Sequence, residues 1–156
     1  MFAFMPKELL KNIEPQYSNL DGNHLYGVDG SISYWQDKQS KKRYLYFGMR
    51  RGGTSYYALD VTDIKAPKLL WKKSAADYPS MGQSWSAPYL DRVGVGDEST
   101  KREAVIISAG YDDVEDRDNS KGKLELDNAS KKVNTKVGKD ILILDAKTGA
   151  KIWSLT

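Results

Sequence analysis

The sequence gathers carboxylates into one acidic stretch that could bind a metal ion. Five stand between positions 112 and 118: Asp112, Asp113, Glu115, Asp116 and Asp118. Oxygen ligands crowded in a flexible loop are the kind that Ca²⁺ prefers. However, their spacing is irregular, Arg117 interrupts them, and no glycine stands where a binding loop would turn. Charge runs of this type usually form solvated surface loops, so we expect these residues to form such a loop without a metal.

The sequence gives little indication of a catalytic nucleophile or a general base. The single histidine, His24, needs a partner within hydrogen-bond reach to act as a base, and the chain has no Gly-x-Ser-x-Gly nucleophile motif. The absence of cysteine excludes thiol catalysis, disulfides and cysteine-ligated zinc. We therefore expect a non-enzymatic protein in which His24 is bonded to the backbone at the end of a strand.

A second cluster, Arg50 and Arg51 followed by Gly52 and Gly53, could bind an anion. Two guanidiniums beside flexible backbone amides suit a phosphate or a carboxylate. The spacing is not that of a phosphate-binding loop, and no helical pattern follows it. We interpret this segment as a hairpin turn with solvated arginines, with anion binding as the alternative.

Size and composition narrow the class of protein. The 156 residues suit a single domain, and 40% hydrophobic with 29% charged residues predict a buried core and a soluble surface. The net charge of +3 is small and spread along the chain, which argues against a nucleic-acid partner. No apolar run reaches the roughly 20 residues that span a bilayer. The first six residues lack the features of a signal peptide, so an export signal would lie upstream.

Short apolar segments between turn signals predict an all-β protein. A lead-in over 1–23 holds the tail of a strand at 2–4 and one short helix over 7–13, which Pro15 ends. The expected strands that follow are 24–28, 31–35, 43–49, 54–61, 68–71, 84–90, 104–109, 141–144 and 151–155. Asp91 to Arg102 and the long polar insertion 110–139 are expected loops.

An internal repeat decides the architecture. Residues 55–63 and 141–149 both read as an apolar strand, Leu-Asp and a turn with threonine, and each is followed by a strand that carries a tryptophan. Aspartate can hold such a turn through backbone N–H groups, and glycine can adopt positive φ there. The tryptophans offer flat packing surfaces. The expected structural motif is Asp60, Thr62, Trp71, Asp145, Thr148, Gly149 and Trp153.

Four strands per repeat with a recurring aromatic motif are typical of β-propeller blades. We predict a partial propeller of about two four-stranded antiparallel blades, at 24–73 and 84–156, forming a single domain over 24–156. Trp85 would lie on an innermost strand and line the central channel. The tyrosines of the strands are expected in the core, with a partner-binding surface as the alternative: Tyr44, Tyr46, Tyr56 and Tyr57.

The residues also carry a family resemblance. The run 144–153 is similar to the blade motif of quinoprotein alcohol dehydrogenase-like propellers. The ordered set of segments 52–63, 69–71, 81–88 and 109–111 resembles the propeller domain of the PilC/PilY family of proteins associated with the tips of bacterial type IV pili. The calcium loop of some members, Asp-x-Asn/Asp-x-Asp-x-x-x-Asp, has no match here, so no cofactor is expected in this chain, and calcium binding stays an open question for a longer parent protein.

The resemblance implies a large exported protein whose seven-bladed propeller supports pilus biogenesis, surface attachment and twitching motility. It would lie at the pilus tip, on the outer membrane surface or in the periplasm. Implied partners are the remaining blades, minor pilins or the pilus tip, and a host or abiotic surface. Two blades cannot close a ring, so we expect a fragment that dimerises through a bare blade face or edge.

Two other functions remain open. A fragment of a dehydrogenase that binds pyrroloquinoline quinone would need a chelating Glu, Asn and Asp, and a catalytic Asp around the quinone; that set is not recognisable in the sequence. A scaffold propeller outside pili is the other alternative, since a fold alone does not define a function.

Overall fold

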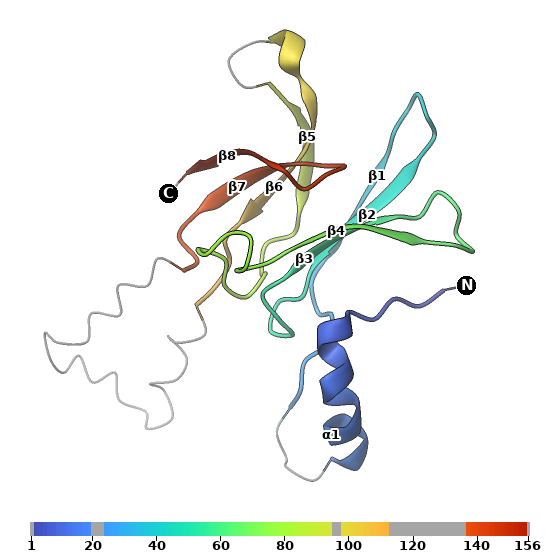
Figure 1. Cartoon of the computed structure of the whole chain (residues 1–156), viewed down its shortest axis with the longest axis vertical. Coiled ribbons are helices and arrows are strands. Elements are labelled where there is room, and N and C mark those ends of the chain that lie inside the picture. Colours follow the sequence, from blue (N-terminus) through green and yellow to red (C-terminus); the bar gives the residue numbers. More distant parts are fainter. Residues whose placement is uncertain (1, 20–23, 95–97, 113–136, 156) are drawn as a thin grey trace, which may run out of the picture.

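The computed structural model describes residues 2–19, 24–94, 98–112 and 137–155. It confirms the all-β prediction: two four-stranded antiparallel sheets follow one another along the chain (Figure 1). The first contains β1 (Ile32–Gln36), β2 (Arg43–Gly48), β3 (Tyr56–Asp60) and β4 (Lys68–Lys73). The second contains β5 (Tyr89–Val93), β6 (Arg102–Ser108), β7 (Ile141–Asp145) and β8 (Lys151–Leu155). The short helical elements are η1 (Lys7–Asn12), α1 (Ile13–Ser18) and η2 (Glu98–Thr100).

The repeat seen in the sequence is reproduced in the strand register. In each sheet one row of paired residues crosses all four strands and ends at the tryptophan. The rows are Ser33, Tyr46, Ala58 and Trp71 in the first sheet, and Tyr89, Ile106, Ile143 and Trp153 in the second. Both sheets also have a register shift directly after the third residue of the row, at Ala58/Leu59 and at Ile143/Leu144. The two sheets are therefore the same structural unit, as adjacent propeller blades are.

The main core lies between the sheets. Alternate residues of β2 and β3 face the second sheet, because successive side chains of a strand point to opposite faces. Buried residues from both sheets and from the connecting segment form this core: Tyr44, Tyr46, Tyr56, Ala58, Trp71, Met81, Val105, Ile107, Leu142, Leu144 and Ala146. The expectation that the strand tyrosines belong to the core is confirmed, because all four are at most 3% exposed.

The N-terminal segment covers the other face of the first sheet. The Phe4 ring lies edge-on to the rings of Phe47 and Tyr57, at 5.9 and 5.7 Å, and Leu9 is buried in the same cluster. Glu8 fastens the segment: its carboxylate accepts hydrogen bonds from the Tyr57 hydroxyl at 2.6 Å and from the Lys72 ammonium at 2.8 Å. The first sheet thus has buried residues on both faces, although Ile32 and Tyr34 of its edge strand β1 remain exposed.

We expect the Glu8 contacts to make stability depend on acidic pH. Burial raises the pKa of Glu8, but hydrogen bonds from Lys72, Tyr57 and Ser55 outweigh it, so the pKa lies below the usual 4.5. A carboxyl with a lowered folded-state pKa stabilises the fold above its unfolded pKa and loses this effect as the pH falls through the folded pKa. Urea denaturation should therefore show Glu8→Gln less stable than wild type at pH 7, with the gap shrinking by pH 3.

Glu14→Gln, at an exposed carboxylate of α1, is the matched control for this pH experiment and should change stability little at either pH. A difference between wild type and Glu8→Gln that stays the same from pH 7 to pH 3 would contradict the assigned role of Glu8.

Three predicted elements of the first 28 residues were wrong. Residues 2–4 and 24–28 form no strand, because Phe2 and Phe4 pack through their rings and the 24–28 segment lies against a turn. A Cβ on Gly52 would come within 1.7 Å of the Gly27 carbonyl oxygen. The helix does not end before Pro15, since Pro15 lies in the first turn of α1, where N–H groups have no intrahelical acceptor.

The fifth strand was predicted too early. The expected strand 84–90 is instead β5, which begins after Pro88 and continues through Asp91–Val93 into the expected loop. Proline has no N–H to give to a ladder, whereas Asp91, Arg92 and Val93 pair with β6. Residues before Pro88 join the sheets through isolated bridges, Arg50 with Ser84 and Gln83 with Tyr111.

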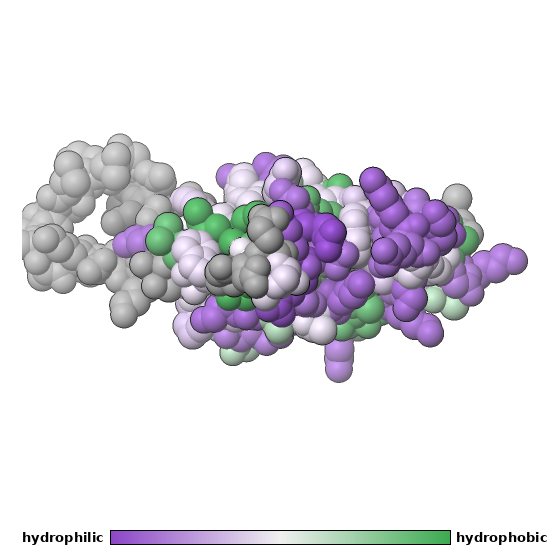
Figure 2. Space-filling view, turned by 90° about the horizontal axis from the view of Figure 1, so that it is seen from above, coloured by the Kyte–Doolittle hydropathy of each residue, from purple (hydrophilic) through white to green (hydrophobic). Residues whose placement is uncertain are grey.

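Charged and polar residues cover most of the surface seen in Figure 2, with hydrophobic residues in small patches between them. No helix in the described ranges is long and apolar enough to cross a membrane.

Candidate functional site

The aspartates of the repeat hold the turns between the third and fourth strands of each sheet. The Asp145 carboxylate accepts hydrogen bonds from the Lys147 and Thr148 amides at 3.0 and 2.8 Å, and from the Thr148 hydroxyl at 2.9 Å. Gly149 follows with φ of +68°, which glycine adopts without the strain of a side chain. Asp145, Thr148 and Gly149 therefore stabilise the turn between β7 and β8.

The first repeat uses its aspartate in the same manner. The Asp60 carboxylate accepts a hydrogen bond from the Thr62 amide at 2.8 Å. The Thr62 hydroxyl in turn accepts the Arg43 amide at 3.0 Å and so connects the turn to the start of β2. Both aspartates therefore hold turns through hydrogen bonds to nearby amides.

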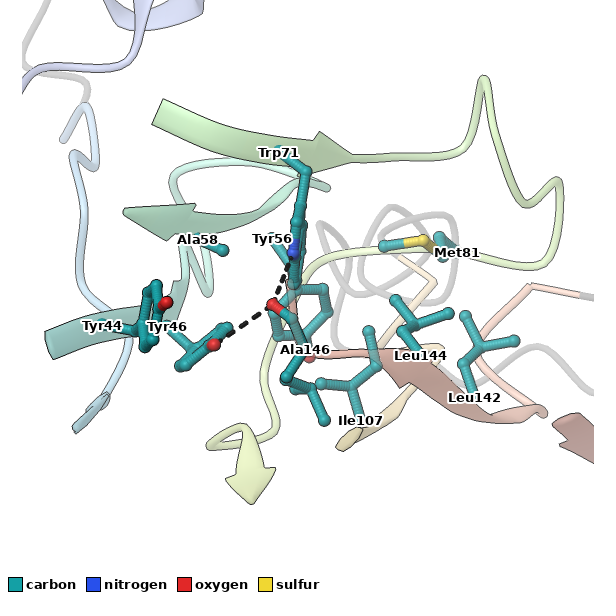
Figure 3. Close-up of a cluster of buried hydrophobic side chains, with 11 residues drawn as sticks. Tyr44, Tyr46, Tyr56, Ala58, Trp71, Met81, Ile107, Leu142, Leu144 and Ala146 are labelled. Carbon is teal, nitrogen blue, oxygen red and sulfur yellow. Dashed lines mark hydrogen bonds between the residues drawn. The ribbon is translucent and has the colours of Figure 1, made fainter. Parts of the chain in front are cut away.

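The first tryptophan of the repeat joins the two sheets. The Trp71 indole N–H donates to the Ala146 carbonyl at 2.9 Å, and the Tyr46 hydroxyl donates to the same oxygen at 3.1 Å (Figure 3). Ala146 follows Asp145 in the turn after β7, so this turn packs against the face of the first sheet. Trp153 occupies the equivalent position of the second sheet but is 42% exposed.

The segment between the sheets carries two serines that connect buried backbone groups. The Ser84 hydroxyl accepts the Met49 amide at 2.7 Å and donates to the Ser55 carbonyl at 2.9 Å. The Ser86 hydroxyl contacts the Tyr56 hydroxyl at 2.7 Å and accepts the Ser108 amide at 3.0 Å. In the sequence these serines were only part of a family motif, because their partners are remote along the chain.

Replacing Ser84 by alanine is expected to lower the free energy of unfolding by about 1–3 kcal/mol, because the Met49 amide would lose its acceptor. Ser84 is fully buried, so water has no access to the Met49 amide and cannot replace the lost hydroxyl as its acceptor. Urea denaturation followed by tryptophan fluorescence measures this loss. Ser31→Ala, at an exposed position, is the matched control, and an equal effect of both substitutions would contradict the role of Ser84.

Two arginines and three aromatic residues form a partly exposed group that we call the guanidinium–aromatic cluster: Tyr26, Arg50, Arg51, Trp85 and Tyr111. The Arg50 guanidinium carbon lies 4.6 Å from the centre of the Trp85 ring. That of Arg51 lies 5.7 Å from the Trp85 ring and 5.6 Å from the Tyr26 ring. Tyr111 lies edge-on to Trp85 with 6.2 Å between ring centres. The cluster combines segments that are remote in the sequence.

The turn predicted at 50–53 is present, but its arginines are not simply solvated. The Gly52 amide donates to the Met49 carbonyl at 2.9 Å and the Gly53 amide to the Arg50 carbonyl at 3.4 Å, so the turn uses the amides that an anion would need. Arg50 itself has φ of +48°. Any anion would therefore be held by the guanidiniums, which lie over aromatic rings.

The prediction for Trp85 was wrong in one respect. Trp85 lies on no strand of the described chain, because it precedes Pro88 and the start of β5. Its indole N–H donates to the Gln83 side-chain oxygen at 3.0 Å, which fixes the ring beneath the arginines.

The other site residues predicted from the sequence are the acidic stretch and His24. Asp112 is 6% exposed, contrary to the expected solvated loop, while Asp113, Glu115, Asp116 and Asp118 lie outside the described residues. In the described ranges no three His, Asp or Glu side chains gather as metal ligands. His24 is exposed, and its ring lies edge-on to Tyr26 at 4.5 Å rather than at the end of a strand.

A cavity of about 510 Å³ opens between the 78–80 segment and β8. Its lining includes Tyr78, Pro79, Leu142 and Lys151 and is mainly apolar. The Tyr78 hydroxyl donates to the Gly149 carbonyl at 3.0 Å. This hydrogen bond supports the β7–β8 turn, so that side of the cavity wall is part of the inter-sheet packing.

Comparison with known proteins supplies the family. No family model matches the sequence. A curated protein of Xylella fastidiosa, "Type IV pilus biogenesis factor PilY1 homolog", is 31% identical over 119 residues, which cover 69% of this chain and 10% of that protein. The "Type IV pilus biogenesis factor PilY1" of Pseudomonas aeruginosa is 29% identical over 120 residues, which cover 74% of this chain and 10% of that protein.

The structural match covers more of the chain. The crystal structure of the Pseudomonas aeruginosa PilY1 C-terminal domain matches 99% of this chain and 25% of that chain, with a TM-score of 0.63 and 26% identity. This chain thus spans about a tenth of the length of the curated relatives. Sequence and structure agree with the resemblance of the motifs at 52–63 and 81–88, and the chain belongs to the PilC/PilY family.

Proposed function

We propose that this chain is a non-enzymatic part of a protein that supports type IV pilus biogenesis. The observation that carries the proposal is the match of nearly the whole chain to the C-terminal domain of PilY1. The motif residues support its non-enzymatic part. Asp60 and Asp145 accept hydrogen bonds from amides of their turns, and Trp71 packs between the two sheets. We place the protein outside the cytoplasm, at the pilus tip, the outer membrane surface or in the periplasm, with minor pilins and a host or abiotic surface as partners and with roles in surface attachment and twitching.

Deletion of the gene in the bacterium that encodes it tests the proposal. We expect fewer surface pili, measured as pilin sheared from the cells, and smaller twitching zones, with the wild-type gene restoring both. A Ser31→Ala gene should restore both as well, whereas a Trp71→Ala gene should not, because its product would be poorly folded. Unchanged piliation after deletion would overturn the proposal, as would saturable uptake of pyrroloquinoline quinone measured by absorbance.

We further propose that the face of the second sheet turned away from the first packs against another sheet of the longer protein. The Trp71 row of the first sheet faces the second sheet, and the equivalent Trp153 row faces away from the core. Its end members Tyr89 and Trp153 are 62% and 42% exposed, and the neighbouring pair Ile141 and Leu155 is exposed too. A contiguous apolar face of this kind marks an interaction site.

In isolation this face is expected to pair two copies of the chain. Size-exclusion chromatography with light scattering should show a dimer fraction that rises with protein concentration. Trp153→Glu should abolish the dimer, because it places a charge in the apolar face, whereas Lys38→Glu at the β1–β2 hairpin tip should not. A monodisperse monomer at every concentration would contradict the prediction.

A further inference from the structure

The guanidinium–aromatic cluster holds more positive charge than the described chain neutralises. Within the described part of the chain, Arg50 has one ion-pair partner, Asp29, at 3.8 Å, and both side chains are well exposed at 39% and 47%. Arg51 makes no ion pair within the described residues and is exposed. Both guanidiniums nevertheless lie over the same Trp85 ring, 4.6 and 5.7 Å from its centre. Two like charges are thus held side by side, and among the described residues Asp29 is the one carboxylate that pairs with them.

The backbone beneath the cluster is set in an unfavourable conformation for an arginine. Arg50 adopts φ of +48°, a left-handed conformation in which non-glycine residues other than Asn and Asp are uncommon. The turn has glycines at positions 52 and 53, but the residue in the left-handed conformation at position 50 is an arginine. The main chain of Arg50 takes part in the local fold, because its amide donates to the Ser84 carbonyl at 3.1 Å. A strained residue with an exposed, pre-positioned side chain is a feature of ligand-binding surfaces.

The contacts of the cluster favour carboxylates of a protein over nucleic-acid phosphates. Two guanidiniums are few for a phosphate backbone, whose binding depends on many cations, and the small net charge is spread along the chain. Arginine, tryptophan and tyrosine together are the residue types enriched at protein–protein interfaces. A planar guanidinium also pairs with a carboxylate through two parallel hydrogen bonds.

We propose that the guanidinium–aromatic cluster binds an acidic peptide segment of a partner protein. Arg51 pairs with a carboxylate of that segment, since its guanidinium lies near the Trp85 and Tyr26 rings and has no ion-pair partner among the described residues. Arg50 takes a second carboxylate in competition with Asp29. The ring edges of Trp85 and Tyr111 contact the apolar parts of the segment. This binding is separate from the proposed pilus role, and its test requires only the purified chain.

Trp85 supplies a direct probe, because its indole N–H is hydrogen-bonded to Gln83 at the centre of the cluster. Nitrogen–proton spectra of the labelled protein resolve the indole signals, and the Trp85→Phe spectrum identifies the one from Trp85. Titration with a capped hexaglutamate peptide at fixed ionic strength should shift this signal saturably. Arg51→Gln should weaken binding roughly fivefold or more, because it removes the charge-assisted pair. Arg102→Gln, which removes one exposed positive charge from the start of β6, should leave binding unchanged.

Three outcomes would overturn the proposal. They are the absence of a saturable shift, an equal loss of affinity in Arg51→Gln and Arg102→Gln, and inorganic phosphate or capped hexalysine shifting the signal as strongly as hexaglutamate. The first would show no binding, the second only an effect of net charge, and the third no preference for an acidic peptide. The unchanged positions of the other indole signals in Arg51→Gln would show that this variant is folded.

Discussion

Replacing Trp71 by alanine is expected to lower the free energy of unfolding by about 3–5 kcal/mol, the usual loss for a large buried aromatic side chain. Trp71 is 5% exposed and packs in the core between the sheets. The substitution would open a cavity there and remove one of the two donors to the Ala146 carbonyl. Guanidinium denaturation followed by far-ultraviolet circular dichroism measures the change without relying on the fluorescence of the lost tryptophan.

The second tryptophan of the repeat is the natural control for this prediction. Trp153→Ala should cost about 1 kcal/mol or less, because a half-exposed side chain leaves little cavity and no broken buried hydrogen bond. Trp71→Phe should fall between the two alanine variants, since it keeps most of the apolar contact while Tyr46 still donates to Ala146. Similar losses for Trp71→Ala and Trp153→Ala would contradict the assigned difference between the two sites.

Gly110→Ala is expected to lower the free energy of unfolding by about 3 kcal/mol or more, the sum of strained backbone and two lost hydrogen bonds. Gly110 has φ of +95°, and a Cβ there would come within 2.0 Å of the Gln83 carbonyl oxygen. The two segments exchange backbone hydrogen bonds between Gln83 and Tyr111, at 2.7 and 2.9 Å. An alanine would push them apart and break this bridge. Thermal or urea denaturation measures the loss.

Gly27→Ala serves as the matched control, because a Cβ at Gly27 would meet no atom within 4 Å and its φ is not in the left-handed range. It should change stability by less than about 1 kcal/mol, with stabilisation expected if the added methyl group restricts the unfolded chain. If Gly110→Ala proved as mild as Gly27→Ala, the close contact between the 83 and 110 segments would be refuted.

The strand pattern of this protein was readable because its signals are local. The alternation in β2 separates Tyr44 and Tyr46 from Leu45 and Phe47, and the structure places these pairs in different clusters. The turns at Asp60 and Asp145 were predictable for the same reason, since the aspartates bond amides two or three residues away. Errors arose where tertiary contacts replaced a ladder, as in the 24–28 segment.

The guanidinium–aromatic cluster was only half visible in the sequence. Arg50 and Arg51 stood out as neighbours, but nothing local showed that Trp85 would lie beneath both guanidiniums. That arrangement depends on the bridge of Arg50 with Ser84 and on the bridge of Gln83 with Tyr111. The serine hydroxyl that accepts the Met49 amide escaped prediction in the same way, because its partner is 35 residues away along the chain.

The repeat at residues 55–63 and 141–149 has some features that follow from local sequence and others that depend on tertiary packing. By itself the sequence determined two four-stranded units, their turn aspartates and their family, because side-chain alternation and turn chemistry act over a few residues. Only the tertiary structure decided that Trp71 is buried against Ala146 while Trp153 is half exposed. The two tryptophans have the same local sequence context, and their burial depends on whether another sheet packs against their face.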